Sequence, residues 1–287
     1  MSQHQQGTSE HWDQVITPKR GLFQTLHLRR VWDYRDLVAL FIKRDLTATY
    51  AQTLLGPLWF FLQPIFTTII FTFIFGNLAG LGNDGIPKPL FYMSGIVLWN
   101  YFAEVLMKTS DTFVANRHIF SKVYFPRLVI PISLTISHLM KLGIQLLLLF
   151  GLMIFYLVKG EITLSWTIVL FPLLIIPVAF LGLGCGLIVT ALTTKYRDLK
   201  YLVNFGIELL RSASPVIFPL STVAGKMKWA LLANPMSAVI ETFRHVCFHT
   251  GQFEWLYLAY SVVSSFLILL LGAVVFSFIE KDFIDTV

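Results

Sequence analysis

The chain has 287 residues, of which 56% are hydrophobic and only 13% are charged. A soluble domain carries about 25% charged residues, so this composition argues against a soluble enzyme. The net charge of +6 does not indicate nucleic-acid binding, because no polar domain is left to host it. In a membrane protein, excess Lys and Arg residues instead mark the cytoplasmic face.

The N-terminal part of the chain predicts a polar tail followed by a helix at the membrane surface. Residues 1–24 are polar and lack the apolar core of a signal peptide, so we expect a disordered cytoplasmic tail. In residues 25–55, apolar side chains recur at three- and four-residue spacing, among them Val31, Val38 and Phe41. This pattern predicts an amphipathic interfacial helix.

Residues 56–287 predict an all-α membrane domain with six transmembrane helices. A span needs about 20 apolar residues, and the stretches that qualify are 56–77, 90–115, 128–158, 165–193, 199–220 and 255–279. With the N-terminus inside, the predicted cytoplasmic segments carry 14 Lys and Arg residues and the outer segments carry 5. This bias predicts that both termini are cytoplasmic.

Residues 216–254, between the fifth and sixth predicted spans, are half apolar but are interrupted by Pro219, Gly225, Pro235 and Gly251. Each piece is too short to cross a bilayer, so we expect one or two re-entrant half-helices that enter from the outside. Irregular backbone at membrane depth requires surrounding protein or a water-filled cavity, which favours a gate. An amphipathic helix resting on the outer leaflet is the alternative.

Motifs of enzymes and of cofactor sites are absent from the sequence. It contains no GxxxxGK[ST] phosphate loop, no HExxH and no GxSxG. His245 and His249 are the one pair spaced to share a metal, and without a third ligand we expect no metal site. The glycines of the LGLGCGL segment (182, 184 and 186) have the spacing that permits close packing of membrane helices.

Charged and aromatic residues within the predicted spans are candidates to line a channel. Glu104, Lys108 and Asp111 share one helix face, and Glu208 lies one turn before Arg211. Ion pairing and a polar conduit both explain these charges, and the roles of His138 and Lys141 stay open. Aromatic residues could line a route for sugars or simply face lipid, and the candidates are Trp59, Phe60, Phe61, Tyr92, Trp99, Tyr101 and Phe102.

Four segments together resemble the type-2 ABC transporter permeases that export polysaccharides, the Wzm/TagG/KpsM group. They are IKRDLTATYAQTLLGPLWFFLQPIFTTIIFTFIFG (42–76), NRHIFSKVYFPR (116–127), KYRDLKYLVN (195–204) followed by SPVIFP (214–219), and NPMSAVIETFR (234–244). The four segments are in register over about 85% of the chain.

The resemblance implies a homodimer of six-span permeases in the bacterial plasma (inner) membrane, bound to two copies of an ABC ATPase subunit. ATP and Mg would be held by that partner and no cofactor by this chain. A lipid-linked glycan, such as O-antigen, capsule or teichoic acid precursor, would move outward through a channel at the dimer interface. Membrane lipid would be the remaining partner.

The resemblance also implies roles for individual residues. The segment that docks on the ATPase would comprise Asn116, Arg117, Lys122, Val123, Tyr124, Phe125, Pro126 and Arg127, supported by Tyr196, Arg197 and Asp198. The outer gate would include Pro219, Asn234, Pro235 and Arg244. Basic residues at the inner surface can capture an anionic lipid head group, and by topology the candidates are Lys43, Arg44, Arg117 and Arg127.

Three other functions stay open at this point. A permease of this family could export a drug or another lipid. A stand-alone secondary transporter or flippase would show an inverted repeat and unpaired intramembrane acids, and the sequence shows neither feature. A membrane-embedded glycosyltransferase would need a clustered acid pair on a soluble face, which the sequence lacks.

Overall fold

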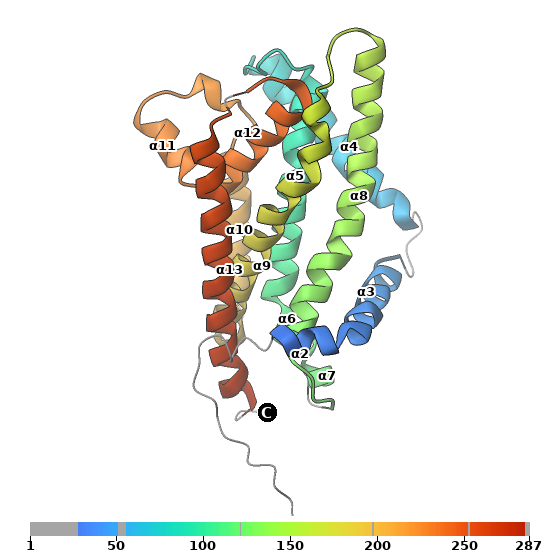
Figure 1. Cartoon of the computed structure of the whole chain (residues 1–287), viewed down its shortest axis with the longest axis vertical. Helices are drawn as coiled ribbons and strands as arrows, with labels where there is room; N and C mark the ends of the chain where they lie inside the picture. Colours follow the sequence, from blue (N-terminus) through green and yellow to red (C-terminus); the bar gives the residue numbers. More distant parts are fainter. Residues whose placement is uncertain (1–27, 51–55, 121, 197, 252, 285–287) are drawn as a thin grey trace, which may run out of the picture.

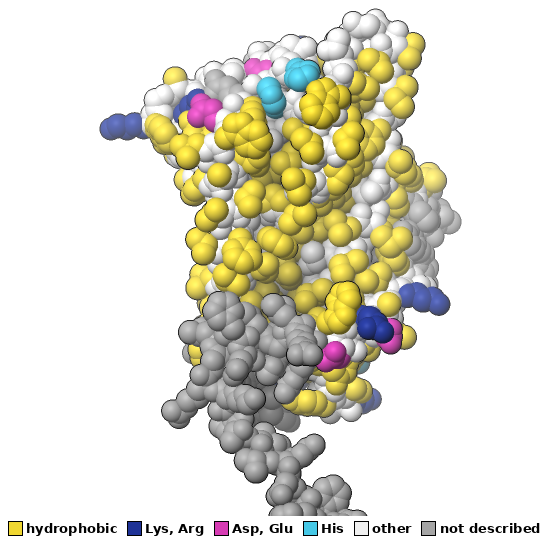
Figure 2. All heavy atoms as spheres, viewed as in Figure 1, with side chains coloured by type: hydrophobic (Ala, Val, Ile, Leu, Met, Phe, Trp, Pro, Cys, Tyr) yellow, Lys and Arg dark blue, Asp and Glu magenta, His cyan; other side chains and the backbone are white. Residues whose placement is uncertain are grey.

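The computed structural model describes residues 28–50, 56–120, 122–196, 198–251 and 253–284, and the regular elements in these ranges are all helical. The predicted tail at 1–24 and the docking residue Arg197 lie outside the described residues. Long helices run side by side along one axis (Figure 1). Figure 2 shows a broad hydrophobic band between two ends that carry the charged side chains.

Within the described ranges, five helical segments are long and apolar enough to cross a membrane: Trp59–Leu78, Lys88–Ser110, Val129–Val158, Trp166–Thr194 and Trp255–Phe278. They comprise α4 (Trp59–Phe71) with the π-helical turn η2 (Thr72–Leu78), α5 (Lys88–Ser110), α8 (Val129–Val158), η3 (Trp166–Leu170) with α9 (Phe171–Lys195), and α13 (Trp255–Ile284). They correspond to the first, second, third, fourth and sixth predicted spans, so a bundle of apolar helices is confirmed.

The remaining predicted span, 199–220, is shorter than expected as a helix. Here α10 (Leu199–Ser212) has 14 residues, and it is followed by a turn that contains Pro215. A proline disfavours helical geometry in the residue before it, which explains why the helix ends ahead of Ser214. The predicted helix boundary at 220 is therefore wrong, and a crossing by this segment stays a prediction.

One end of the bundle, which we call the basal end, carries α2 (Leu28–Asp33), α3 (Arg35–Tyr50), α6 (Thr112–Ala115), α7 (Arg117–Phe120) and the last turns of α13 (Figure 1). Part of the apolar stripe predicted for α2 and α3 is buried here, whereas Tyr34 is exposed. Val31, Val38 and Phe41 are 8%, 9% and 4% exposed and belong to a cluster with Phe125 and Phe276. The charged residues Asp33 and Asp36 face outward.

The opposite, apical end carries η4 (Leu220–Thr222), α11 (Lys226–Leu232) and α12 (Pro235–Phe248) (Figure 1). Pro235 occupies the first turn of α12, where its missing N–H costs nothing. The side chain of Asn234 caps the same helix by accepting a hydrogen bond from the Met236 N–H at 3.1 Å. With 7 and 14 residues, α11 and α12 are too short to span.

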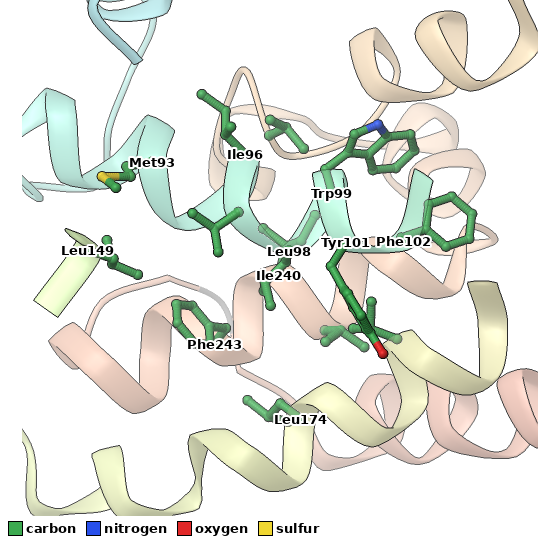
Figure 3. Close-up of a cluster of buried hydrophobic side chains, with 14 of the residues drawn as sticks. Met93, Ile96, Leu98, Trp99, Tyr101, Phe102, Leu149, Leu174, Ile240 and Phe243 are labelled. Atoms are coloured by element: carbon green, nitrogen blue, oxygen red, sulfur yellow. The ribbon is translucent and has the colours of Figure 1, made fainter. Parts of the chain in front are cut away.

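The core is built around α5, which packs against α4, α8, α9, α10 and α12. Its residues Phe91, Tyr92, Ile96 and Trp99 are each at most 1% exposed. Figure 3 shows how side chains of α5 meet those of neighbouring helices, including Phe243 of α12. The stretch 89–99 of α5 is apolar on nearly all sides, as expected at the centre of a bundle, whereas Glu104 and Lys108 lie in its last two turns.

The LGLGCGL glycines bring α9 against two neighbours, which confirms the packing interpretation. A Cβ on Gly186 would lie 2.5 Å from Cβ of Thr109 on α5, and one on Gly182 would lie 3.1 Å from the Phe102 carbonyl oxygen. Between them, Gly184 faces α13, where a Cβ on Gly272 would lie 2.4 Å from the Gly184 carbonyl oxygen. Only residues without a side chain permit so close an approach of the backbones.

Candidate functional site

The connection between α5 and α8 forms the tip of the basal end. It runs through α6 and α7 and then through residues 122–126, which are outside regular secondary structure. This connection includes the predicted docking segment. Its side chains divide into an anchored set and an exposed set.

Aromatic stacking anchors the segment on the bundle. The Phe125 ring, 4% exposed, lies 5.8 Å from that of Phe41 on α3 and 5.6 Å from that of Phe120. The guanidinium of Arg127 lies over the rings of Phe113 and Phe120, at 5.6 and 5.4 Å from their centroids. Such cation–π contacts are strengthened when water is excluded, and Arg127 is only 9% exposed.

The other side of the segment is open. Tyr124 is 88% exposed and Val123 57% exposed, and Arg117 and Lys122 are also exposed. An exposed Tyr on a backbone held by buried neighbours is well suited to a protein interface, since Tyr combines apolar area with few rotatable bonds. Pro126 is half-buried between the two sets.

The turn between α9 and α10 also lies among the exposed parts of the chain. Its predicted docking residues Tyr196 and Asp198 are both exposed. Lys200, in the first turn of α10, forms an ion pair with Asp111, which lies between α5 and α6. This ion pair connects the α9–α10 turn to the start of the docking connection.

The four predicted head-group residues differ in their surroundings. Arg44 pairs with Asp45 at 2.8 Å, stacks on Phe41 at 4.7 Å and donates to Asn116 Oδ1 at 3.4 Å. Asn116, 7% exposed, in turn donates to the Thr112 carbonyl at 3.0 Å. Arg44 and Arg127 thus hold the docking segment in place.

Lys43 and Arg117 are the two head-group candidates that are exposed. Both lie at the basal end, Lys43 on α3 and Arg117 at the start of α7. These two side chains are therefore the ones placed to meet an external anion.

Most of the predicted intramembrane charges form ion pairs, some between helices and some within one helix. Glu104 on α5 forms an ion pair with Lys141 on α8, and His138 Nε2 lies 4.0 Å from the same carboxylate. Glu208 pairs with Arg211 along α10. Ion pairing is thus present at these sites, whereas Lys108 is exposed.

The aromatic candidates for a sugar route lie at different depths. Tyr92, Trp99 and Tyr101 are at most 2% exposed and contact other helices of the same chain. Phe60 is 9% exposed, with Lys141 Nζ 5.1 Å from its centroid. Trp59 is the candidate with a largely open side chain, at 51% exposure.

At the apical end, Arg244 binds α12 to its neighbours. Its side chain, 1% exposed, donates to the Pro215 carbonyl at 2.6 Å, to the Phe91 carbonyl at 3.1 Å and to Ser94 Oγ at 3.2 Å. Glu241 accepts from it at 3.3 Å. Burial lowers the pKa of Arg244 to about 10, which Glu241 counteracts, so the guanidinium is charged at neutral pH.

Several of these partners escaped the sequence prediction. Glu241 is 1% exposed and also accepts from the Leu220 N–H at 3.1 Å, which ties η4 to α12. Gly95 leaves the space for Arg244, because a Cβ there would lie 2.9 Å from the guanidinium and 3.1 Å from Cα of Val216. The available signal was the i,i+3 spacing of Glu241 and Arg244 in an otherwise apolar stretch.

The other predicted gate residues support this arrangement. Asn234 donates to Ser214 Oγ at 2.9 Å, which fixes the start of α12 on the turn after α10. Pro219 is buried and precedes η4. The ring centroids of His245 and His249 lie 5.9 Å apart. No group of three His, Cys, Asp or Glu side chains occurs among the described residues that could hold a metal ion.

A family model described as ABC-2 type transporter matches residues 36–248, about three quarters of the chain. The chain belongs to the ABC-2 transporter family. The matched region of this ABC-2 protein contains both the docking segment at the basal end and Arg244 at the apical end.

Curated relatives agree with the family. The chain is 25% identical over 251 residues to the O-antigen export system permease protein RfbA of Klebsiella pneumoniae, which covers 87% of this chain and 94% of that protein. It is 28% identical over 222 residues to the protein of the same name from Myxococcus xanthus, with 76% and 83% covered. The polysialic acid transport protein KpsM of Escherichia coli is 27% identical over 217 residues, with 72% and 78% covered.

Proposed function

We propose that this chain is the permease subunit of an ATP-driven ABC exporter that moves a lipid-linked polysaccharide outward across the bacterial plasma membrane. The observation that carries the proposal is the docking segment of this ABC-2 family member, where exposed Tyr124 projects from a backbone anchored by Phe125 and Arg127. The printed names of the relatives, O-antigen export permease and polysialic acid transport protein, support a glycan as the cargo.

The basal end faces the cytoplasm in this proposal. The segments assigned to that side carry 14 Lys and Arg residues against 5 on the other, which is the bias expected of cytoplasmic loops. Both termini are then cytoplasmic, α2 and α3 lie in the inner membrane surface, and α10 with the following turn completes six spans. The helices α11 and α12 form a re-entrant outer gate.

The working unit is a homodimer bound to two ATPase subunits, which hold the ATP and Mg. Large apolar side chains on α4 and α10 are available for a second copy or for lipid, among them Phe66 at 57%, Tyr201 at 78% and Phe205 at 61% exposure. A channel at the dimer interface would be lined by the exposed members of the predicted channel-lining set, namely Trp59, Lys108 and Glu208. The buried Tyr92, Trp99 and Tyr101 would support its wall from behind.

Different residues of the chain bind the lipid head group and transmit movement from the docking segment. Exposed Lys43 and Arg117 attract the anionic head group of the carrier lipid at the inner surface. A movement of the docking segment passes directly into α5, since the two are joined through α6. At its other end α5 is bonded to the gate helix α12 through Arg244, which meets the Phe91 carbonyl and Ser94.

Purification of the tagged chain from its native membrane in a mild detergent tests the proposal, with copurifying chains identified and counted. We expect an equimolar partner that carries a phosphate loop, and ATP-dependent appearance of glycan at the outer face of reconstituted vesicles. Transport by the chain alone, without a nucleotide-binding partner, would overturn the proposal and favour a secondary transporter.

A further inference from the structure

A cavity of about 280 Å³ opens between α3, α4, α5 and α8 in the basal half of the bundle. Its polar wall is formed by Glu104 and Lys108 of α5 and by His138 and Lys141 of α8. Phe60 of α4 closes one side. The exporter proposed above uses Lys108 as one open residue of the channel wall and gives no role to the cavity as a whole.

Two carboxylates, Asp45 and Glu104, and two ammonium groups, Lys108 and Lys141, line the cavity, but they are not paired with one another in equal measure. Asp45 of α3 is paired with Arg44 at 2.8 Å, and Glu104 is paired with Lys141. Lys108 has no carboxylate partner in the part of the chain that the structure describes. Because Arg44 holds Asp45 from outside the lining, Lys108 is the ammonium group of the cavity that is left without a carboxylate partner among the described residues.

The cavity lies in the basal half of the membrane-spanning helices. Lys108 is in the last turn of α5, and Lys141 is the thirteenth residue of α8, roughly 18 Å along that helix. The adjoining helix α3 packs Val38 and Phe41 against the basal end of the bundle. If the basal end is cytoplasmic, as the proposed function holds, this depth corresponds to the inner leaflet, where a carrier lipid is loaded.

We propose that this cavity binds the phosphate group of a lipid. Lys108 provides the first ammonium contact, and Glu104 acts as the resident anion that keeps Lys141 in place until a phosphate displaces it. Phosphate oxygens accept charge-assisted hydrogen bonds from ammonium groups, and Phe60 and Leu46 supply apolar surface for the first carbons of the chain. The orientation of the site rests on the proposed function, whereas its chemistry rests on the cavity.

Equilibrium binding of farnesyl phosphate to the full-length chain, purified with its copurifying subunits into phosphatidylcholine nanodiscs, tests this inference. Lys108→Gln should weaken binding about tenfold, the loss of one strong ionic contact. Lys108→Arg should retain most of the affinity because it keeps the charge. Glu104→Gln should tighten binding several-fold, because the competing carboxylate is removed. Lys159→Gln, directly after the apical end of the helix that carries Lys141, serves as the control and should bind normally.

Nanodiscs that contain phosphatidylglycerol separate the two sources of lipid phosphate. Loss of farnesyl phosphate binding there would assign the cavity to bulk anionic phospholipid, and persistence would assign it to the prenyl-linked cargo. Either result supports a lipid phosphate site. Equal binding of farnesol, or unchanged affinity in Lys108→Gln and Glu104→Gln, would overturn it. Failure of the wild-type complex to export glycan would instead count against the proposed function, since the binding assay does not require transport.

Discussion

The guanidinium of Arg244 lies 3.6 Å from the centroid of the Phe91 ring, so a single side chain joins the apical helix α12 to the central helix α5. The same guanidinium reaches the Pro215 carbonyl in the turn after α10. Three segments distant in sequence therefore converge on one buried cation. This convergence determines where α12 sits in the bundle.

Replacement of Arg244 should destabilise the protein strongly. Arg244→Met leaves Glu241 buried without its cation, along with two carbonyls that lose a donor, and removal of one partner of a buried ion pair costs about 3–5 kcal/mol. Arg244→Lys should rescue little, because an ammonium cannot serve the same set of acceptors. Thermal unfolding of the purified chain in detergent measures the loss. The exposed Arg117→Met should change stability by less than about 1 kcal/mol, and an equal loss in both variants would contradict the assigned role.

Gly95 should not tolerate a methyl group. In Gly95→Ala the new Cβ would lie 2.9 Å from the Arg244 guanidinium and 3.1 Å from Cα of Val216, so backbone or cation must shift. Overpacking of this kind costs about 1–3 kcal/mol. Gly143→Ala on α8 is the matched control, because nothing lies within 4 Å of its Cβ and alanine favours the helix. A lower unfolding temperature is expected for the first variant alone, and similar behaviour of the two would refute the steric argument.

The apolar spans were predictable because their signal is local and additive. The predicted stretches 128–158 and 165–193 differ by a residue or two from the observed segments Val129–Val158 and Trp166–Thr194. Length and hydropathy determine such boundaries without knowledge of the neighbouring helices. The shorter α10 departs from prediction because Pro215 ends the helix inside a stretch of favourable hydropathy.

Pairing between elements could not be predicted in the same way. Glu104 and Lys108 have ideal spacing for an ion pair along α5, yet the carboxylate pairs with Lys141 of α8. Tyr and Trp are residue types enriched at membrane interfaces. Tyr92 and Trp99 are nevertheless buried, because five helices surround α5. Both outcomes depend on which helix faces lie together in the folded protein, and the spacing of residues within one helix does not contain that information.

A methyl group on Gly272 should separate α9 from α13. The Cβ of Gly272→Ala would lie 2.4 Å from the Gly184 carbonyl oxygen, a backbone atom that cannot move without its helix. We expect a loss of about 1–3 kcal/mol in stability, as for other overpacked sites. Gly151→Ala on α8 meets nothing within 4 Å and should unfold like the wild type or later. Thermal unfolding of the two variants under identical detergent conditions decides the matter, and an unchanged Gly272→Ala protein would rule out the close approach.

Substitution of two adjacent aromatic residues of the docking segment should distinguish an effect on coupling to the ATPase from an effect on folding. Tyr124→Ala removes an 88% exposed side chain, so stability should change by no more than about 0.5 kcal/mol. Phe125→Ala removes a buried ring that packs on Phe41 and Phe120, at a cost of about 3–5 kcal/mol. If the segment docks on an ATPase, Tyr124→Ala should lower ATP-dependent export and partner copurification while the unfolding temperature is retained. Normal export and normal partner recovery in a stable Tyr124→Ala protein would remove the docking assignment, because the most exposed side chain of the segment would then contribute nothing to contact with the partner.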